Sequence, residues 1–473
     1  MMRMGRFLEL FKPISRFIPE VNKPERRISF NARLAWTGLA LVIYLVMSEI
    51  PLYGVSMGPE SSAMLTYRVI FASTRGTLME LGIGPIVTAG LIIQLLAGAR
   101  MIEVDFSNPE DRALFTAASK VFSLIMIMLQ SAIYIISGAF GTVTFGISVL
   151  IFLQLLASGI IIMLLDELLQ KGWGIGSGIS LFIVAGIAQR IWWDSLSFIP
   201  VGDGKRLGAI FAFFESIILG EPIWNWFHRS GGFPDMIGLI TTITVFAVVI
   251  YVEGMRVELP VSHSTFRGYR GKMPIKLLYV SNIPVIFAYA LFANIQLGSQ
   301  LIWQRWNQDN SNFWLGLLGT YNRSERGLMP TGGLVYYVTS PGGVEAISAD
   351  PVRVIIYISI VVSVCVLFSK LWIEVGGMGP EKVAEQLIQS GMQVPGFRRS
   401  KGPIESLLRR YIPTITILGG LLVGLISSVS ELFGVFGSGM GALLCVSILY
   451  QFYQVIIQEQ IEDLYPFLRG ALG

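Results

Sequence analysis

A long apolar stretch that contains helix-breaking residues places the strongest constraint on the fold of this chain. Residues 76–99 carry one charge, Glu80, and are numerous enough to cross a hydrocarbon core of about 30 Å. Gly82, Gly84 and Pro85 nevertheless lie in the first half of the stretch. Proline inside a helix removes a backbone hydrogen bond, and in lipid the freed group needs a partner from protein or water. We therefore expect residues 82–85 to line an interior cavity.

The composition defines a polytopic membrane protein. Of 473 residues, 53% are hydrophobic and 14% are charged, whereas about a quarter of the residues of a soluble domain are charged. Apolar runs long enough to span a bilayer predict ten transmembrane helices, at residues 34–53, 76–99, 113–140, 147–169, 175–193, 236–255, 275–297, 352–373, 412–429 and 436–457. Residues 61–73 have apolar residues at helical spacing but are too few to span, and they predict a short half-helix folded back into the protein.

The distribution of positive charge predicts the orientation. Ten spans place both termini on one side, and 24 of the 35 lysines and arginines lie on that side. Because positive charge marks the cytosolic face, both termini are expected in the cytosol. Residues 1–33 mix basic and apolar side chains, which favours an amphipathic helix on an anionic membrane face, ended near Pro19; a solvated tail is the alternative. Two halves then follow, at 34–196 and 236–457, separated by an external loop at 197–235 and followed by a cytosolic tail at 458–473.

Two pairs of matching segments indicate an internal repeat. Pro85 in the second span corresponds to Pro284 in the seventh, and the glycine-rich start of the fifth span, 174–179, corresponds to that of the tenth, 437–441. Each half has an odd number of spans, so matching helices run in opposite directions. We expect an all-α membrane protein of ten helices in two inverted five-helix halves. Close packing of glycines between helices is the alternative interpretation of the second pair.

The candidate residues near the middle of these helices are all aliphatic. They are Ile83, Val87, Ile175, Ile179, Ile286 and Leu444. A carrier of small solutes or ions needs polar ligands at this depth. A ring of aliphatic side chains instead excludes water and blocks ions without selecting one cargo. Ordinary core packing would explain the same residues.

Several long runs give the chain a resemblance to a known family. The runs are KPERRISF (23–30), RGTLMELGIGPIVTAGLIIQLLAG (75–98), LLDELLQKGWGIGSGISLF (164–182), PIKLLYVSNIPVI (274–286) and GSGMGALL (437–444). They resemble the SecY family, the large subunit of the Sec protein-conducting channel, over essentially the whole chain. The similarity is to the archaeal and eukaryotic branch, and the loop between spans eight and nine is more similar to archaeal members.

The resemblance implies a clamshell with an hourglass pore and assigns roles to particular residues. The six aliphatic residues fall at the pore-ring positions, and spans two and three against seven and eight would form a lateral gate. Thr88, Gln130 and Asn294 fall at a polar cluster in that gate, although each could simply bond a backbone carbonyl. The plug positions would be Ser61, Ser62, Ala63, Met64, Leu65, Thr66, Tyr67, Arg68, Val69, Ile70, Phe71, Ala72 and Ser73.

The resemblance also implies partners. Basic residues in two cytosolic loops would contact ribosomal RNA, because guanidinium groups bind phosphate through salt-sensitive contacts. They are Arg267, Arg270 and Lys272 in the six-seven loop and Arg398, Arg399 and Lys401 in the eight-nine loop. Basic loops also arise from membrane topology alone. A SecE/gamma-type single-span subunit and a beta-type subunit would complete a heterotrimer that receives the ribosome, its nascent chain, signal sequences and surrounding lipid.

The expected function is passage of unfolded polypeptide across the membrane and release of transmembrane segments sideways into lipid. A secondary transporter of a small solute and an insertase without a through-pore are the alternatives. We expect no enzymatic activity, no metal and no cofactor, and a location in the cell membrane of an archaeon or the endoplasmic reticulum of a eukaryote. Cys365 and Cys445 are expected to be buried thiols, and Asp166 and Glu167 a solvated cluster at a helix end.

Overall fold

The computed structural model describes most of the chain. The described residues are 13, 18–26, 28–55, 72–98, 101–102, 104, 108–136, 140, 143–201, 204–229, 232–263, 270–280, 283–324, 327–342, 345–389, 392–393 and 401–464. Most of the predicted amphipathic helix at the N-terminus therefore lies outside the described residues.

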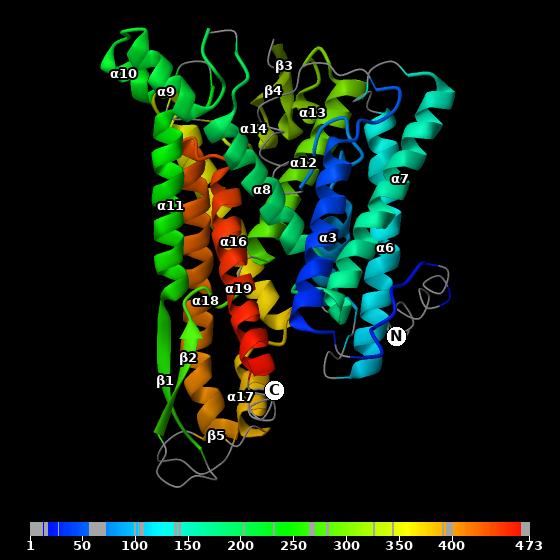
Figure 1. Ribbon diagram of the computed structural model, residues 1–473, viewed down its shortest axis with the longest axis vertical. Helices are drawn as coiled ribbons and strands as arrows, with labels where there is room; N and C mark the ends of the chain where they lie inside the picture. The colour runs from blue at the N-terminus through cyan, green and yellow to red at the C-terminus, as the bar shows by residue number, and fades with distance from the viewer. Residues whose placement is uncertain are drawn as a thin grey trace.

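Ten main helices form the body of the protein and lie roughly side by side along its long axis (Figure 1). In the first half they are α3 (Phe30–Glu49), α5 (Gly84–Gly98), α6 (Pro109–Ile136), α7 (Phe145–Leu168) with a π-helical extension η1 (Leu169–Trp173), and α8 (Gly178–Leu196). In the second half they are α11 (Met236–Gly254), α12 (Ile283–Trp306), α16 (Pro351–Val375), α18 (Lys401–Leu432) and α19 (Gly439–Leu464). Eight helices of the described chain are long and apolar enough to cross a membrane; α5 is shorter than these, and α8 is not among them.

Smaller elements cover the two ends of the bundle. At the end labelled with α9 in Figure 1 are α9 (Ala209–Ile218), α10 (Ile223–Phe227), α13 (Phe313–Leu318), β3 (Thr320–Ser324), β4 (Gly327–Gly332) and α14 (Leu334–Val338); α15 (Glu345–Ala349) precedes α16. At the opposite end are β1 (Arg256–His263), β2 (Arg270–Lys276), α17 (Pro380–Gln389) and β5 (Met392–Gln393). These β-strands form an antiparallel sheet in the order β2-β1-β5, which joins the loop before α12 to the loop before α18.

The interrupted span is helical only in its second part. Helix α5 begins at Gly84, and residues 76–83 form turns that are held by backbone hydrogen bonds to the end of α3, including one of 2.8 Å from the N–H of Leu52 to the carbonyl of Gly76. Gly82 has a φ of +53°, a conformation that glycine adopts without strain. Pro85 is therefore the second residue of a helix, where its missing N–H removes no helical hydrogen bond. The expectation of a proline inside a helix was wrong, and residues 82–85 are all buried.

The seventh span shows the same correction. It was expected to begin at residue 275, but residues 275–276 end β2 and α12 begins only at Ile283. Pro284 is the second residue of α12, as Pro85 is of α5. The matched prolines thus mark the beginnings of two corresponding helices, since a fixed φ near −65° suits the first turn of a helix.

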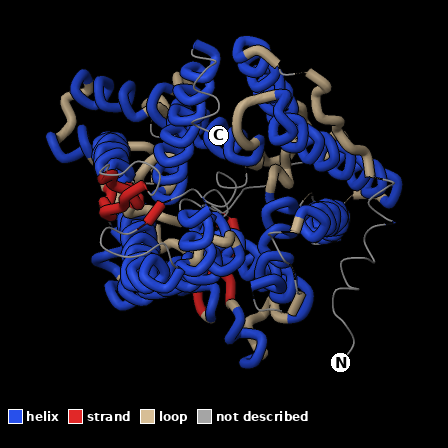
Figure 2. Tube along the Cα trace, turned by 90° about the horizontal axis from the view of Figure 1, so that it is seen from below, coloured by secondary structure: helices blue, strands red, loops and turns tan. Residues whose placement is uncertain are grey.

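The largest apolar core lies between the two halves. Buried side chains from α3, α5, α8, α11, α12, α16 and α19 belong to one continuous cluster. Seen along the bundle, the helices are arranged around a common centre (Figure 2). The predicted inverted halves therefore pack against each other mainly through apolar side chains.

A buried ion network holds the N-terminal segment against the first half. Glu167 on α7 is 7% exposed and lies 2.6 Å from the Lys120 ammonium of α6 and 2.7 Å from that of Lys171. Lys171 also lies 2.6 Å from the carboxylate of Glu20, and the indole N–H of Trp173 donates to the carbonyl of Asn22 over 2.8 Å. The expected solvated cluster at Asp166 and Glu167 was therefore wrong, because both carboxylates are buried and partnered.

This network predicts that docking of residues 18–26 depends on pH. The hydrogen bond from Lys171 lowers the pKa of Glu20 below its ordinary value, with a further contribution from Lys120, while slight burial opposes both. A lowered folded pKa means that the contribution to docking is complete above the unfolded pKa of about 4.3 and is lost as the pH falls through the folded value. Hydrogen exchange of residues 18–26, corrected for intrinsic rates, should be slow from pH 5 to 7 and accelerate below about pH 4. In Glu20→Gln the amides of residues 18–26 should exchange fast over the whole pH range. If the variant instead shows the same pH dependence of exchange as the wild type, Glu20 does not have this role.

Candidate functional site

Most of the expected pore ring lies in the core between the halves. Ile83, Val87, Ile286 and Leu444 belong to the same apolar cluster, with exposed fractions of 0%, 5%, 9% and 0%, and Ile179 packs against it. The sixth residue, Ile175, is 3% exposed but is not a member of this cluster. The structure thus brings five of the six side chains together from α8, α12, α19 and the beginning of α5.

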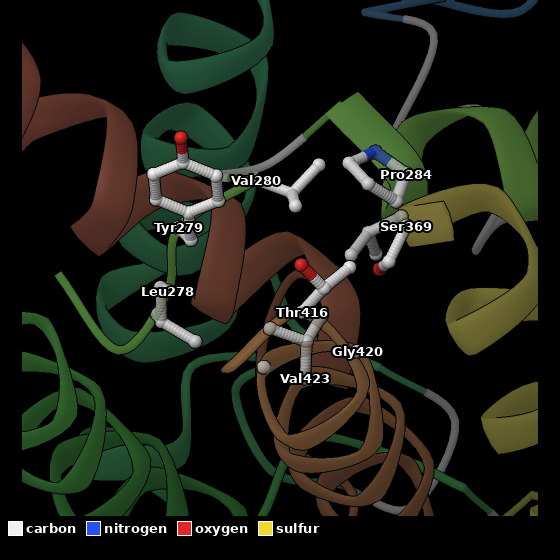
Figure 3. Close-up of a pocket in the computed structure, with 10 residues that line it drawn as sticks. Leu278, Tyr279, Val280, Pro284, Ser369, Thr416, Gly420 and Val423 are labelled. Carbon is white, nitrogen blue, oxygen red and sulfur yellow. The ribbon is translucent and has the colours of Figure 1, made fainter. Parts of the chain in front are cut away.

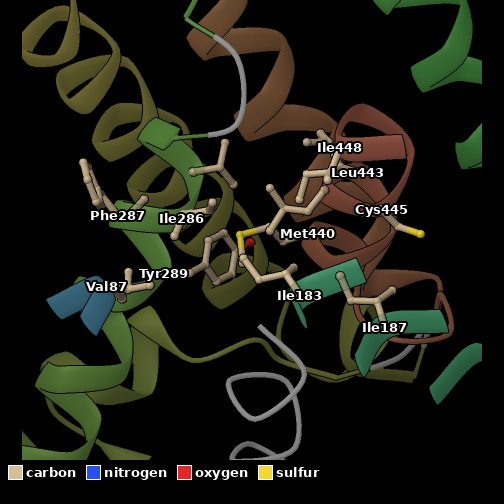
Figure 4. Packing of buried hydrophobic residues seen from close by; sticks show 14 of the residues in the cluster. Val87, Ile183, Ile187, Ile286, Phe287, Tyr289, Met440, Leu443, Cys445 and Ile448 are labelled. Carbon is tan, nitrogen blue, oxygen red and sulfur yellow. The ribbon is translucent and has the colours of Figure 1, made fainter. Parts of the chain in front are cut away.

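Two neighbours in the same cluster were missed from the sequence. Ile183 lies one turn after Ile179 on α8, and Met440 lies one turn before Leu444 on α19; both are fully buried. Figure 4 shows Ile183, Met440 and Ile286 pointing toward one another. Spacing of four residues on a helix places side chains on one face, so extending the ring by one turn in each helix would have found them. Tyr289 lies beside them in the same cluster, so the centre is lined by aliphatic, thioether and aromatic groups with no charged group among them.

A polar contact joins the halves beside this centre. The side-chain amide of Asn294 on α12 donates to the Thr88 hydroxyl of α5 over 3.2 Å and to the carbonyl of Ala290 over 2.7 Å. Thr88 is 4% exposed. Gln130 on α6 is also buried, but no hydrogen bond joins its described side chain to either of the other two. The structure brings together two members of the expected polar cluster and not the third.

Helix α5 forms the seam with the second half. It contacts α12 and α16 from that half and α6 from its own. The Thr88–Asn294 hydrogen bond lies within this seam. The structure thus shows the contact of span two with spans seven and eight, which is part of the lateral gate expected between spans two and three and spans seven and eight.

The expected plug can be followed only at its end, because residues 61–71 lie outside the described residues. The carbonyl of Ala72 accepts a hydrogen bond of 3.3 Å from the Tyr44 hydroxyl of α3, and Ala72 is 2% exposed. The Ser73 hydroxyl donates to the carbonyl of Glu80. The end of the segment is thus anchored both to α3 and to the turns that precede α5.

The expected ribosome-binding residues are described only in part. Arg267, Arg398 and Arg399 lie outside the described residues. Arg270 and Lys272 lie on β2, and Lys401 is the first residue of α18, with side chains that are not described. Pairing of β1 with both β2 and β5 nevertheless brings the two basic loops together at one end of the molecule.

A pocket between α12, α16 and α18 bears on the transporter alternative (Figure 3). Apolar side chains, glycines and Pro284 line most of it, with Tyr279, Ser369 and Thr416 as its only polar side chains. The hydroxyls of Ser369 and Thr416 donate to carbonyls of their own helices over 2.8 and 2.7 Å, and that of Tyr279 donates to the carbonyl of Met378 over 3.0 Å. No charged side chain lines the pocket, so it is unsuited to binding an ion or a charged solute.

Taken together, an inverted pair of five-helix halves, an apolar centre and a narrow polar seam define a membrane protein of the channel class. The family model of SecY matches residues 77–453, and the model described as the plug domain of Sec61p matches residues 42–76. The chain belongs to the SecY family.

Named relatives occur in both branches that the sequence resembles. The chain is 42% identical to the protein translocase subunit SecY of Pyrococcus furiosus, over 98% of this chain and 99% of the relative. It is 43% identical to the protein transport protein Sec61 subunit alpha of Dictyostelium discoideum, over 99% of each. Archaeal and eukaryotic relatives are thus similar to the chain to nearly the same degree, as the resemblance to both branches predicts.

Solved structures match the fold over nearly the whole chain. A structure described as that of a protein conducting channel has a TM-score of 0.82 at 38% identity and covers 97% of this chain and 99% of its own. Sec61 in a canine ribosome-channel complex from the endoplasmic reticulum has a TM-score of 0.80 at 37% identity, with the same coverage. The ten-helix clamshell expected from the sequence is confirmed.

Proposed function

We propose that this chain is the pore-forming subunit of a Sec-type channel, which passes unfolded polypeptide across the membrane and releases apolar segments sideways into lipid. The observation that carries the proposal is the position of the apolar centre. Side chains from both halves meet there, and family structures of protein-conducting channels share the fold over 97% of the chain. A centre made of aliphatic groups accepts any extended peptide because it makes no hydrogen bonds that would select one sequence.

The same side chains act as the seal when no peptide is present. Ile83, Val87, Ile286 and Leu444 are at most 9% exposed, so they fill the space between the halves. An ion at such a constriction cannot exchange its hydration water for other ligands, and the barrier to its passage is high. A peptide strand separates the side chains and replaces their mutual contacts with contacts to itself. Opening and resealing then require only small displacements of helices and no making or breaking of covalent bonds.

Release into lipid would take place at the seam of α5 with α12 and α16. The Thr88–Asn294 hydrogen bond holds this seam at one polar point among apolar neighbours. An apolar segment of the translocating chain competes with the packing of the seam, and a polar segment does not. The expected plug, residues 61–73, would close the external side beneath the ring.

The proposal includes orientation and partners. The excess of lysine and arginine on the side of the termini favours a cytosolic location for both ends. The basic loops joined by β1, β2 and β5 would then face a ribosome, and a family structure matching this chain is a ribosome-channel complex. A SecE/gamma-type subunit and a beta-type subunit would complete the heterotrimer, because exposed apolar side chains remain on the outer faces of α3 and α11 for other helices or lipid.

Crosslinking of a stalled nascent chain tests the proposed path. A photoreactive amino acid at Ile83 should crosslink to a secreted precursor held in the channel, and one at Thr88 should crosslink to an emerging transmembrane segment. The same probe at Ile127, which is fully buried between α6 and α7, is the matched control and should crosslink to neither. Equal labelling at Ile127 and Ile83 would contradict the path. Solute-coupled ion flux without ribosomes would favour a transporter, and insertion without translocation would favour an insertase.

A further inference from the structure

Two of the helices that carry the proposed ring begin in the same way. Helix α8 begins at Gly178 and α19 at Gly439, each near the end of a preceding span. The glycine two residues earlier has a left-handed conformation in both, with φ of +72° at Gly176 and +70° at Gly437. These glycines belong to the matched glycine segments of the two halves. Close packing between helices explains why they are small, and the positive φ is a second reason for glycine at these positions.

A carboxylate from the preceding span caps each of these helices. Asp166, in the last turn of α7, accepts a hydrogen bond of 3.0 Å from the backbone N–H of Ile179. Glu431, in the last turn of α18, accepts one of 2.7 Å from the N–H of Gly439. The first N–H groups of a helix have no partner within it, and Ser177, the N-cap of α8, makes no side-chain cap of its own. In α8 the long-range carboxylate supplies the missing acceptor. In α19 the Ser438 hydroxyl accepts from the N–H of Gly441 over 3.0 Å, and Glu431 adds the acceptor for Gly439.

Each helix also begins in direct contact with the residue that caps it. A Cβ atom on Gly178 would lie 2.6 Å from Cα of Asp166, and a Cβ atom on Gly439 would lie 2.6 Å from the backbone nitrogen of Glu431. No side chain larger than hydrogen can occupy either position without moving the helix. The hydrogen bond and the close approach therefore act on the same few atoms.

The two helix beginnings are also packed against the opposite half. A Cβ atom on Gly176 would lie 2.8 Å from the ring of Phe452, near the middle of α19, and one on Gly437 would lie 3.3 Å from Ile187, near the middle of α8. The contacts are reciprocal, as expected for two antiparallel helices related by an inverted repeat. A shift of either helix along its axis would disturb its cap and its packing on the partner helix together.

We propose that Asp166 and Glu431 are positioning residues that fix where α8 and α19 begin, and with them the depth of Ile179 and Leu444 in the ring. This inference rests on the proposed function. Asp166 bonds the backbone of Ile179 itself, so the cap acts directly on a ring residue. Leu444 is the sixth residue of α19, close enough to Gly439 that the cap sets its height along the axis. Gln170 fixes the second oxygen of Asp166 over 2.7 Å, which orients the carboxylate.

Hydrogen exchange and ion leak of the full chain in liposomes test the positioning role. Asp166→Ala leaves the Ile179 amide without its acceptor, so this amide should exchange roughly tenfold faster or more, and resting ion leak should rise severalfold. Asp166→Asn keeps an oxygen acceptor, and Gln170 can rotate its amide to match; both readouts should return to within about twofold of wild type. Rescue by asparagine is not expected if the negative charge were responsible.

Two further variants separate positioning from general destabilisation. Gly178→Ala keeps the carboxylate but displaces the start of α8, and it should leak like Asp166→Ala. Asp235→Ala removes a cap outside the ring, the 2.8 Å bond from the Gly238 N–H at the start of α11, together with the 3.2 Å contact of Asp235 with His228. It should accelerate exchange of Gly238 without leak. Glu431→Ala should repeat the result at the Gly439 amide.

The outcomes distinguish this inference from the proposed function. Unchanged exchange of the Ile179 amide in Asp166→Ala overturns the cap. Faster exchange without leak, in a channel that leaks when Ile179 is replaced by serine, overturns the link between cap and ring. If Ile179→Ser itself does not leak, the proposed ring fails and the positioning role falls with it, while the exchange data still report the cap.

Discussion

Replacing Ile83 with asparagine is expected to raise the resting ion conductance of the reconstituted channel at least tenfold. Ile83 is fully buried in the apolar core between the halves, at the point where the chain turns into α5. A dry constriction blocks ions because water leaves it, and an amide at this position both retains water and offers a ligand. A tenfold increase corresponds to a barrier lowered by about 1.4 kcal/mol, which is modest for removing one face of an apolar ring.

The controls for this prediction separate leak from loss of stability. Asparagine at a buried isoleucine also costs stability, on the order of a large-to-small core substitution, about 2–5 kcal/mol. Ile127→Asn makes the same change at an equally buried residue in a different apolar cluster, between α6 and α7, and should destabilise without leak. Ile83→Leu keeps the volume and the apolar surface and should not leak. Conductance measured in planar bilayers that is equal for the two asparagine variants would count against the ring.

The sequence predicted the architecture because membrane spans leave a strong signal. Apolar length predicted the ten main helices, and the paired prolines and glycine segments predicted the inverted halves. The predicted helix boundaries were less accurate where an apolar segment is buried without being helical. Residues 76–83 are as apolar as a helix, but hydrogen bonds to the end of α3 and the left-handed Gly82 hold them in turns. Hydropathy does not distinguish a buried turn from a buried helix.

The candidate site was predictable as a list of residues and less so as a set of contacts. From the sequence alone, the six aliphatic residues could equally be ordinary core, and the resemblance to the family singled them out. The structure places five of them in one apolar cluster, which does not include the buried Ile175. Asp166 was interpreted as solvated because a carboxylate near a helix end usually is. Its partner is the backbone of Ile179, thirteen residues later, and a contact of that kind depends on the turn between α7 and α8. The sequence signal for this contact is a carboxylate in the last turn of one helix, followed by a glycine-rich segment at the start of the next.

Joining Thr88 to Asn294 covalently is expected to abolish release of transmembrane segments and to reduce the translocation rate to a small fraction of that of the wild type. Their polar side-chain atoms lie 3.2 Å apart across the seam of α5 and α12. Thr88→Cys with Asn294→Cys, bridged by a short bis-methanethiosulfonate reagent, ties the two halves where they must separate. The native thiols Cys365 and Cys445 are 0% and 4% exposed and should not react. A reductant that cleaves the bridge should restore activity in the same vesicles.

A matched bridge within one half shows whether the seam, rather than crosslinking in general, is responsible. A Cβ atom on Gly159 would lie 2.8 Å from Cγ2 of Ile127, which is close to the separation that a disulfide requires between a Cβ atom and the far sulfur. Ile127→Cys with Gly159→Cys therefore ties α6 to α7 without crossing the seam, and translocation should continue. If the bridged seam variant still releases transmembrane segments, measured by protease protection and carbonate extraction of a reporter, α5 and α12 do not form the exit. If both bridges abolish activity, the channel needs motion within its first half, and a rigid clamshell is the wrong description of its opening.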